Sequence, residues 1–165
     1  MGFLDKLTGT RRPAPGTPRS TPEEVLAALI AVGGPDDPYR VFEGGRGDAD
    51  LTAEWRLDEP RWSTVFEQRD VHRLVQITMR IDSEAGEVRS LDRAVTVTWS
   101  AGVAQLSFTK EFKRGQINEM SFRGELSPAG YERTWSFSTE ELKEPLRRTA
   151  LDHGWGWKGV TFGRL

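Results

Sequence analysis

The side chains best suited to acid–base chemistry in this sequence are its two histidines, because imidazole titrates near neutral pH. His72 follows Asp70 by two positions, so a carboxylate could orient its ring as in a general base. His72 also falls among the polar positions of an alternating segment, which is typical of a surface histidine. His153 stands at the expected end of a helix, where the helix dipole stabilises a cation. Each histidine therefore has a simple structural role, and the sequence predicts no catalytic residue.

Common motifs of catalysis and metal binding are absent from the chain. It has no GxxxxGK[S/T] phosphate loop, no HExxH zinc motif, no GxSxG elbow and no EF-hand loop. It has no cysteine, so thiol chemistry and disulfides are excluded, and a zinc site would depend on two histidines and carboxylates. The sequence predicts neither a metal site nor a cofactor. An enzyme with an unrecognised histidine–carboxylate site is the least favoured of three hypotheses developed below.

Charge and composition narrow the classes of function further. The 23 Lys and Arg residues nearly balance the 25 Asp and Glu residues, whereas a general nucleic-acid-binding domain is strongly basic. No long apolar run could form a transmembrane helix, and the N-terminus lacks the pattern of a secretory signal. The absence of cysteine favours a reducing compartment, and arginines far outnumber lysines, as in GC-rich bacterial genomes. We therefore expect a bacterial, cytoplasmic protein without a nucleic-acid partner.

The first 20 residues differ in composition from the rest of the chain. Phe3, Leu4 and Leu7 are spaced for one face of a short helix, and the Pro/Arg/Thr-rich linker RRPAPGTPRS follows. We expect residues 1–20 to form a flexible arm that could dock weakly on a membrane surface or in a groove of a partner protein. Residues 21–165 have the length of a single domain, which we predict to be α+β.

Two capping boxes predict the starts of two helices. The tetrapeptide TPEE opens a helix over residues 22–32, and STEE opens a second helix over residues 139–153. Gly154 is the expected stop of the second helix. Pro145 lies too far inside it to be the first helical residue, so we expect a kink or a break there.

Between these helices, apolar side chains recur at every second position, which is typical of strands with one buried face. The alternation starts at Leu51, continues less clearly through Trp62 and Phe66, and returns in a hairpin whose turn is SEAG. Short apolar segments follow up to Phe137, and the tail WGWKGVTF is apolar enough to form an edge strand or to cover one end of the sheet. Because the connections are short, we predict a strongly curved antiparallel meander of six or seven strands, closed by the C-terminal helix.

One predicted strand carries a charged side chain on its aromatic side. Alternation places Arg133 on the same side as Tyr131 and Trp135. A guanidinium among aromatic rings on a concave sheet could stack on a ring or bind an anion. Together with Trp55 and Trp99 on other strands, these residues are the candidate lining of a site for a small anionic or lipid-like ligand. The alternatives are a core simply filled by tryptophans, or a bulge or salt bridge that accounts for Arg133.

The C-terminal run FSTEELKEPLRRTALDHGWGWKGVTFGRL, with LTAEWRLDEPRWSTVF and RIDSEAGEVRSLD, resembles a bacterial protein family without an assigned activity. The resemblance covers residues 50–165, and its most specific part is the ending W-x-W-x-G-V-x-F-G. A fainter similarity to tubby-like and phospholipid-scramblase-like folds implies an antiparallel barrel around a C-terminal helix. From these observations we expect a non-enzymatic binding or adaptor module, most simply for a protein partner. The anionic ligand site and the unrecognised enzyme are its alternatives.

Overall fold

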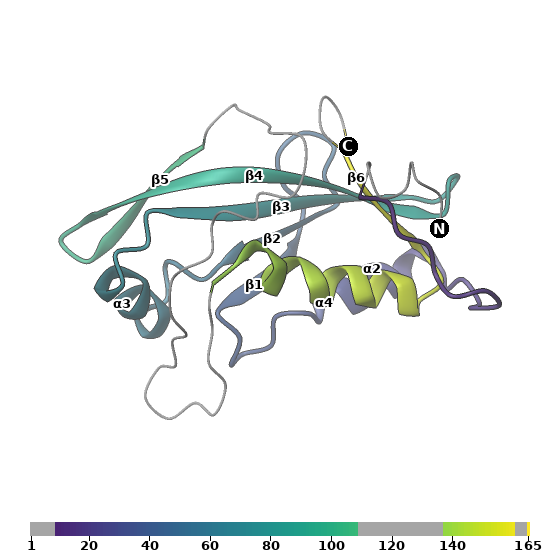
Figure 1. Ribbon diagram of the computed structural model, residues 1–165, viewed down its shortest axis with the longest axis horizontal. Helices are drawn as coiled ribbons and strands as arrows, with labels where there is room; N and C mark the ends of the chain where they lie inside the picture. The colour runs from purple at the N-terminus through teal and green to yellow at the C-terminus, as the bar shows by residue number, and fades with distance from the viewer. Residues whose placement is uncertain (1–8, 109–136, 161–164) are drawn as a thin grey trace.

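The computed structural model describes residues 9–108, 137–160 and 165, which form three helices and six strands (Figure 1). The chain is therefore an α+β protein. In chain order the elements are α2 (Pro22–Ile30), β1 (Tyr39–Glu43), β2 (Leu51–Trp55), α3 (Pro60–Gln68), β3 (Arg73–Asp82), β4 (Glu87–Ser100), β5 (Val103–Phe108), α4 (Thr139–Asp152) and β6 (Gly156–Gly159).

The strands form one mixed sheet that is mostly antiparallel. Strands β1 to β5 follow one another in the order of the sequence, each antiparallel to its neighbour, as a meander requires. Strand β6 instead runs parallel to the first part of β4, with Val88 opposite Trp157. Strand β5 pairs with the second part of the same strand, with Val95 opposite Phe108. The long strand β4 thus has two different neighbours along one edge.

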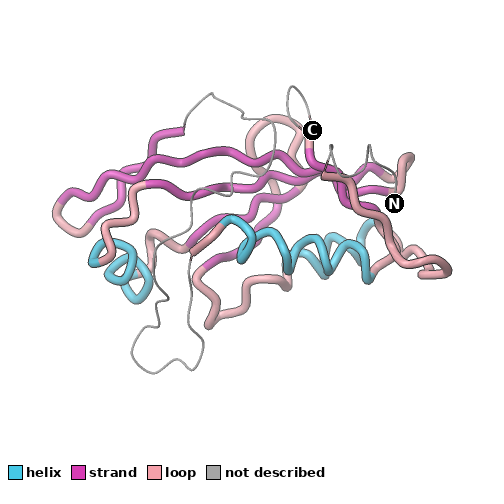
Figure 2. The backbone as a smooth tube through the Cα atoms, in the orientation of Figure 1, coloured by secondary structure: helices cyan, strands magenta, loops and turns pink. Residues whose placement is uncertain are grey.

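The prediction of a strongly curved sheet is wrong, whereas the C-terminal helix does cover one face of the sheet. The sheet is open, and α2 and α4 lie next to each other below it rather than inside it (Figure 2). A sheet can wrap around a helix only if that helix is apolar on all sides, whereas the fully buried apolar side chains of α4 lie on one stripe. They are Leu142, Leu146 and Ala150. The remaining sides of α4 carry charged residues, so the helix packs on one face of an open sheet.

The face that α2 and α4 cover is named the inner face here. Its strand side chains alternate with those of the other face. Ile81 and Asp92 on this face are half-buried, whereas the other apolar side chains of β1 to β4 on this face are buried, which is the pattern of a half-buried sheet. These side chains are Tyr39, Val41, Leu51, Ala53, Trp55, Val75, Ile77, Met79, Val88 and Ala94. Trp55 is central at one end, with its ring centroid 6.2 Å from that of Phe66 and 5.6 Å from that of Phe137. The inner face is therefore a filled core.

Trp62 and Phe66 lie in a helix, α3, and not in the strand that their spacing suggested. Pro60 occupies the first turn of α3, a position that has no hydrogen bond to lose. The interval of four residues places Trp62 and Phe66 on one side of the helix, where both are fully buried. The prediction was wrong because an interval of four residues fits both the two-residue period of a strand and the 3.6-residue period of a helix.

The other two helices begin where the capping boxes predict. The Thr21 hydroxyl accepts from the Glu24 N–H at 3.2 Å, and Ser138 caps α4 in the same way. Helix α4 runs from residue 139 to 152 without interruption, so the break considered at Pro145 is not found. Within the described residues, no helix has the length and apolar character needed to cross a membrane.

Residues 156–159 of the tail form strand β6 of the sheet, as predicted, and Trp155 and Trp157 are buried, whereas Phe162 lies outside the described residues. Residues 9–20 lie beside it. Arg11 and Trp157 exchange two main-chain hydrogen bonds of 2.7 and 2.9 Å. The Trp155 indole N–H donates to the carbonyl of Ser20 at 3.1 Å. The mobility of residues 1–20 stays a prediction, and residues 1–8, with Phe3, Leu4 and Leu7, lie outside the described part.

Candidate functional site

The opposite side of the sheet, named the outer face here, carries a row of polar side chains across four strands. Arg40 and Glu54 are cross-strand partners on β1 and β2, and Gln76 and Arg93 are partners on β3 and β4. The Gln76 amide links these two cross-strand pairs by donating to the Glu54 carboxylate at 3.2 Å. Because these side chains are polar, this face cannot form a second closed apolar layer like the inner face.

A hollow of about 540 Å³ opens on the outer face beside this row. One wall is the side of α3 that carries Ser63, Thr64 and Glu67, turned away from the buried Trp62 and Phe66. The opposite wall is the end of the β4–β5 hairpin, and the floor is formed by β2 and β3. Its size lies within the range of about 300–1,000 Å³ that is usual for ligand pockets.

The hairpin wall is apolar and exposed to solvent. Leu106 is 46 % exposed, Phe108 is 38 % exposed and Val103 is 62 % exposed. These are three of the four large apolar side chains that are exposed in the described chain. Deeper in the hollow, Leu74 and Val95 are buried. The apolar surface of the hollow therefore runs from exposed side chains on the wall to buried ones at its base, which favours burial of an apolar group.

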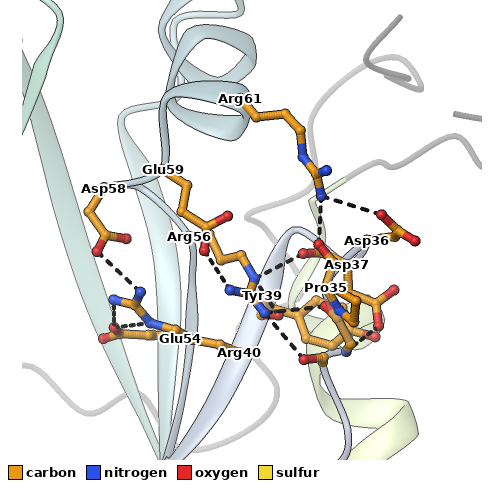
Figure 3. A network of polar contacts seen from close by, with 12 residues as sticks. Pro35, Asp36, Asp37, Tyr39, Arg40, Glu54, Arg56, Asp58, Glu59 and Arg61 are labelled. Atoms are coloured by element: carbon orange, nitrogen blue, oxygen red, sulfur yellow. Dashed lines mark hydrogen bonds and ion pairs between the residues drawn. The ribbon is translucent and has the colours of Figure 1, made fainter. Parts of the chain in front are cut away.

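Charged groups in the floor are held in fixed positions (Figure 3). Arg40 donates to Glu54 through Nη2 at 2.8 Å and through Nε at 3.1 Å, and Nη1 donates to Asp58 at 3.1 Å. Although burial lowers the pKa of Arg40, its hydrogen bonds with these two carboxylates raise it above the ordinary value. Glu54 also accepts from Gln76, so its orientation is set on both oxygens. A preorganised floor of this kind loses little freedom when a ligand binds.

The charge of the hollow is negative. Its charged lining residues are Arg40, Glu54, Asp58 and Glu67, which sum to two negative charges. Arg40 already serves two of the carboxylates, whereas Glu67 is exposed on the α3 wall and no ion pair to it is found within the described residues. An occupant with a cationic group therefore fits this lining better than an anion does.

Arg56 fastens α3, and with it one wall of the hollow, to the rest of the fold (Figure 3). Its Nη1 atom donates to Glu59 at 2.5 Å, next to the first residue of α3. Its remaining nitrogen atoms donate to four main-chain carbonyls between residues 33 and 39, at 3.1 to 3.3 Å. One half-buried guanidinium thus joins the end of α2, the start of β1 and the start of α3.

Of the aromatic residues proposed to form a ligand site, the structure describes two. Trp55 belongs to the inner face, is 4 % exposed and borders the hollow. Trp99 lies on the outer side of β4, half-buried, and its indole N–H donates to the Val71 carbonyl at 3.1 Å. The two tryptophans are thus not brought together. The other three, Tyr131, Arg133 and Trp135, lie outside the described residues.

Neither histidine lines the hollow. His72 and Asp70 do meet, with Nε2 2.7 Å from Oδ1, but both side chains are more than half exposed. The Nδ1 atom of His153 lies 2.9 Å from the carbonyl of Thr149 at the end of α4. Across the ranges that the structure describes, no three His, Cys, Asp or Glu side chains lie close enough to hold a metal ion together.

One motif escaped the sequence analysis: Gly154, Gly156 and Gly159 have the spacing of a GxGxxG dinucleotide loop. In that motif the glycines follow a strand and open a helix. Here Gly154 follows helix α4, and the other two glycines are the first and last residues of strand β6, so their context is different. Gly154 has a positive φ of 75°, and a Cβ there would lie 2.4 Å from the Pro18 carbonyl oxygen. This glycine therefore follows the end of α4 and leaves room for the main chain of residues 9–20 to pass close by.

Comparison with known proteins gives no relative for this chain. No protein-family model, no curated protein and no solved structure matches it. The resemblances to a bacterial family and to tubby-like and scramblase-like folds stay predictions.

Proposed function

We propose that this protein is a non-enzymatic binding or adaptor module of the bacterial cytoplasm, and that the hollow of the outer face is its binding site. The observation that carries the proposal is the hollow itself, where an exposed apolar wall faces fixed charged groups. Apolar area supplies affinity and a few oriented polar groups supply specificity, which is the usual composition of a binding site. Composition supports the compartment, because the chain has no cysteine.

The proposed occupant is a short segment of a protein partner that carries an apolar and a basic side chain. The apolar side chain would pack on Leu106 and Phe108, which are otherwise exposed. The basic side chain would pair with Glu67 on the opposite wall. Charge complementarity supports this choice, because the lining carries a net two negative charges. The same charges oppose the alternative in which a small anion occupies this hollow.

A pair of peptides tests the proposal. A labelled peptide of alternating leucine and arginine is titrated with the full chain by fluorescence anisotropy, and a leucine–glutamate peptide of equal length is the control. We expect saturable binding of the basic peptide, and at least a tenfold weaker interaction of the acidic one.

Variants of the two walls assign the binding to the hollow. Glu67→Gln and Leu106→Ser should each weaken binding of the basic peptide, whereas Glu84→Gln, an exposed carboxylate in the β3–β4 turn, should not. Preference for the acidic peptide would favour the anionic-ligand alternative. Equal effects of Glu67→Gln and Glu84→Gln would contradict a site in the hollow.

A further inference from the structure

Three cationic side chains lie next to one another on the outer face, where β3, β4 and β6 run side by side (Figure 1). Arg80 on β3 is the direct cross-strand partner of Arg89 on β4. Arg89 is in turn the partner of Lys158 on β6. Directly opposite residues of a sheet have Cβ atoms about 4.5–5.5 Å apart, and like charges at that distance destabilise the sheet. Such a row needs compensation by negative charge.

The surrounding groups compensate the two ends of the row better than its centre. Arg80 donates to the main-chain oxygen of Leu165 at 2.9 Å, and the Lys158 ammonium lies 3.5 Å from the Glu87 carboxylate. Two further carboxylates lie near this end of β3. Asp50 accepts from the Ile81 N–H at 2.8 Å, and Asp82, the last residue of the strand, accepts from the Ala85 N–H at 3.0 Å. Among the described residues, no Asp or Glu side chain forms an ion pair with Arg80 or Arg89.

Arg89, at the centre of the row, has a hydrogen-bond donor without an acceptor. Its Nε–H is enclosed and has no hydrogen-bond partner within the residues that the structure describes. An enclosed donor of a charged group without an acceptor costs more than a neutral one, because charge-assisted hydrogen bonds are the strong ones. The neighbouring Arg80 and Lys158 add positive potential at the same point. An acceptor with more than one negative charge that meets the terminal nitrogen atoms of Arg89 would offset the positive charge of all three side chains.

We propose that the Arg80–Arg89–Lys158 row is a binding site for the phosphate group of a small molecule. A phosphate monoester carries about −1.5 to −2 charges at pH 7 and three acceptor oxygens, so it can bridge three cations, which a single carboxylate matches less well. The row lies on the outer face but uses none of the hollow's lining residues. This site therefore does not depend on the function proposed for the hollow.

Calorimetric titration of the full chain with inorganic phosphate tests the site, with chloride at equal ionic strength as the reference. We expect saturable one-to-one binding. Arg89→Met removes the central donor without removing the side-chain volume, and Lys158→Gln neutralises one end, so each should weaken phosphate binding by about tenfold or more. Arg73→Gln changes an exposed arginine at the far end of β3 and should leave the affinity unchanged.

Stability measurements separate a binding defect from a folding defect. Because Arg89→Met relieves like-charge repulsion, its urea midpoint without phosphate should equal or exceed that of the wild type. If Arg89→Met does not fold, Lys158→Gln carries the test, since its side chain is 42 % exposed. Absence of saturable binding, or equal phosphate affinity in the wild type and the folded variants, would overturn the proposal. An equal rise of the urea midpoint with phosphate in all variants would mean a general salt effect and would also overturn it.

Discussion

The inner and outer faces of this sheet are made by alternate residues of the same strands, but they differ in what those residues contact. Inner-face side chains pack against α2, α4 and one another until they are almost fully buried. Outer-face side chains include Arg40, Glu54 and Arg93, which need water or a charged partner. The buried side chains of the inner face thus form most of the core, whereas the outer face keeps its charged side chains near the surface.

The arginines of the outer face differ in how well they are satisfied. Arg40 has two carboxylate partners, and its pKa is raised despite the opposing effect of burial. Arg93 lies over the Phe108 ring, with its Cζ 4.1 Å from the ring centroid, and burial together with nearby Arg46 lowers its pKa. Among the described residues Arg93 thus has no carboxylate partner, although it lies beside Phe108 at the hollow. Four predictions test this division between the two faces.

The largest expected effect is that of Trp157→Ala on the inner face. Trp157 is 2 % exposed, lies opposite Val88 and pairs with Arg11 through the main chain. Removing a buried tryptophan leaves a cavity, so we expect a loss of about 3–5 kcal/mol in the free energy of unfolding. A urea titration measures it. An unchanged midpoint would show that the tail is not part of the core.

Lys143→Met should have the next largest effect. Lys143 of α4 is 8 % exposed and forms an ion pair with Asp92 of β4. Removing one partner of a fully buried pair costs about 3–5 kcal/mol, and we expect about 2–3 kcal/mol here because Asp92 retains contact with water. The double variant Lys143→Met with Asp92→Leu should recover most of this loss. A double variant less stable than the single one would mean that the pair itself stabilises the fold.

Arg56→Gln tests the connection between the two faces. The substitution removes hydrogen bonds of a charged group that is 14 % exposed, so we expect a loss of about 2 kcal/mol in urea titrations. It should also weaken basic-peptide binding, because Arg56 positions α3. Arg56→Lys should recover little of the lost stability and binding, since an ammonium cannot reproduce the planar donor arrangement of a guanidinium. Normal peptide binding by Arg56→Gln would mean that the α3 wall does not contribute to the site.

Leu106→Ser should have the smallest effect on stability. Leu106 is 46 % exposed, and surface substitutions usually change the free energy of unfolding by less than about 0.5 kcal/mol. The same substitution removes part of the apolar wall, so peptide binding should fall although the urea midpoint does not. A large loss of stability would show that the hairpin belongs to the core.

The sequence predicts the local features of this fold well. Both capping boxes, the turn before β4 and the burial of Trp155 and Trp157 follow from residues close together in the chain. The open form of the sheet was not predicted, because it depends on which sides of α4 can be buried. Helix α3 was missed because the interval from Trp62 to Phe66 fits both a strand and a helix.

The candidate sites are less predictable than the fold. The hollow requires α3 and the β4–β5 hairpin to face each other, and no local pattern specifies this. The opposition of Arg80 and Arg89 follows from the hairpin turn, but Lys158 joins the row through the register of a parallel strand. That register depends on the packing of Trp157 in the core, so sequence periodicity alone cannot supply it.

Chemical-shift mapping with two matched probes tests the central claim, that the hollow is a binding site for an apolar group bearing a positive charge. The ¹⁵N-labelled protein is titrated with hexylammonium and, separately, with hexanoate, which share the same apolar chain. We expect hexylammonium to shift the amide signals of residues 63–67, 74–76 and 102–106, and hexanoate to leave them unchanged. Equal shifts by hexanoate at these residues, or hexylammonium shifts only elsewhere, would contradict it.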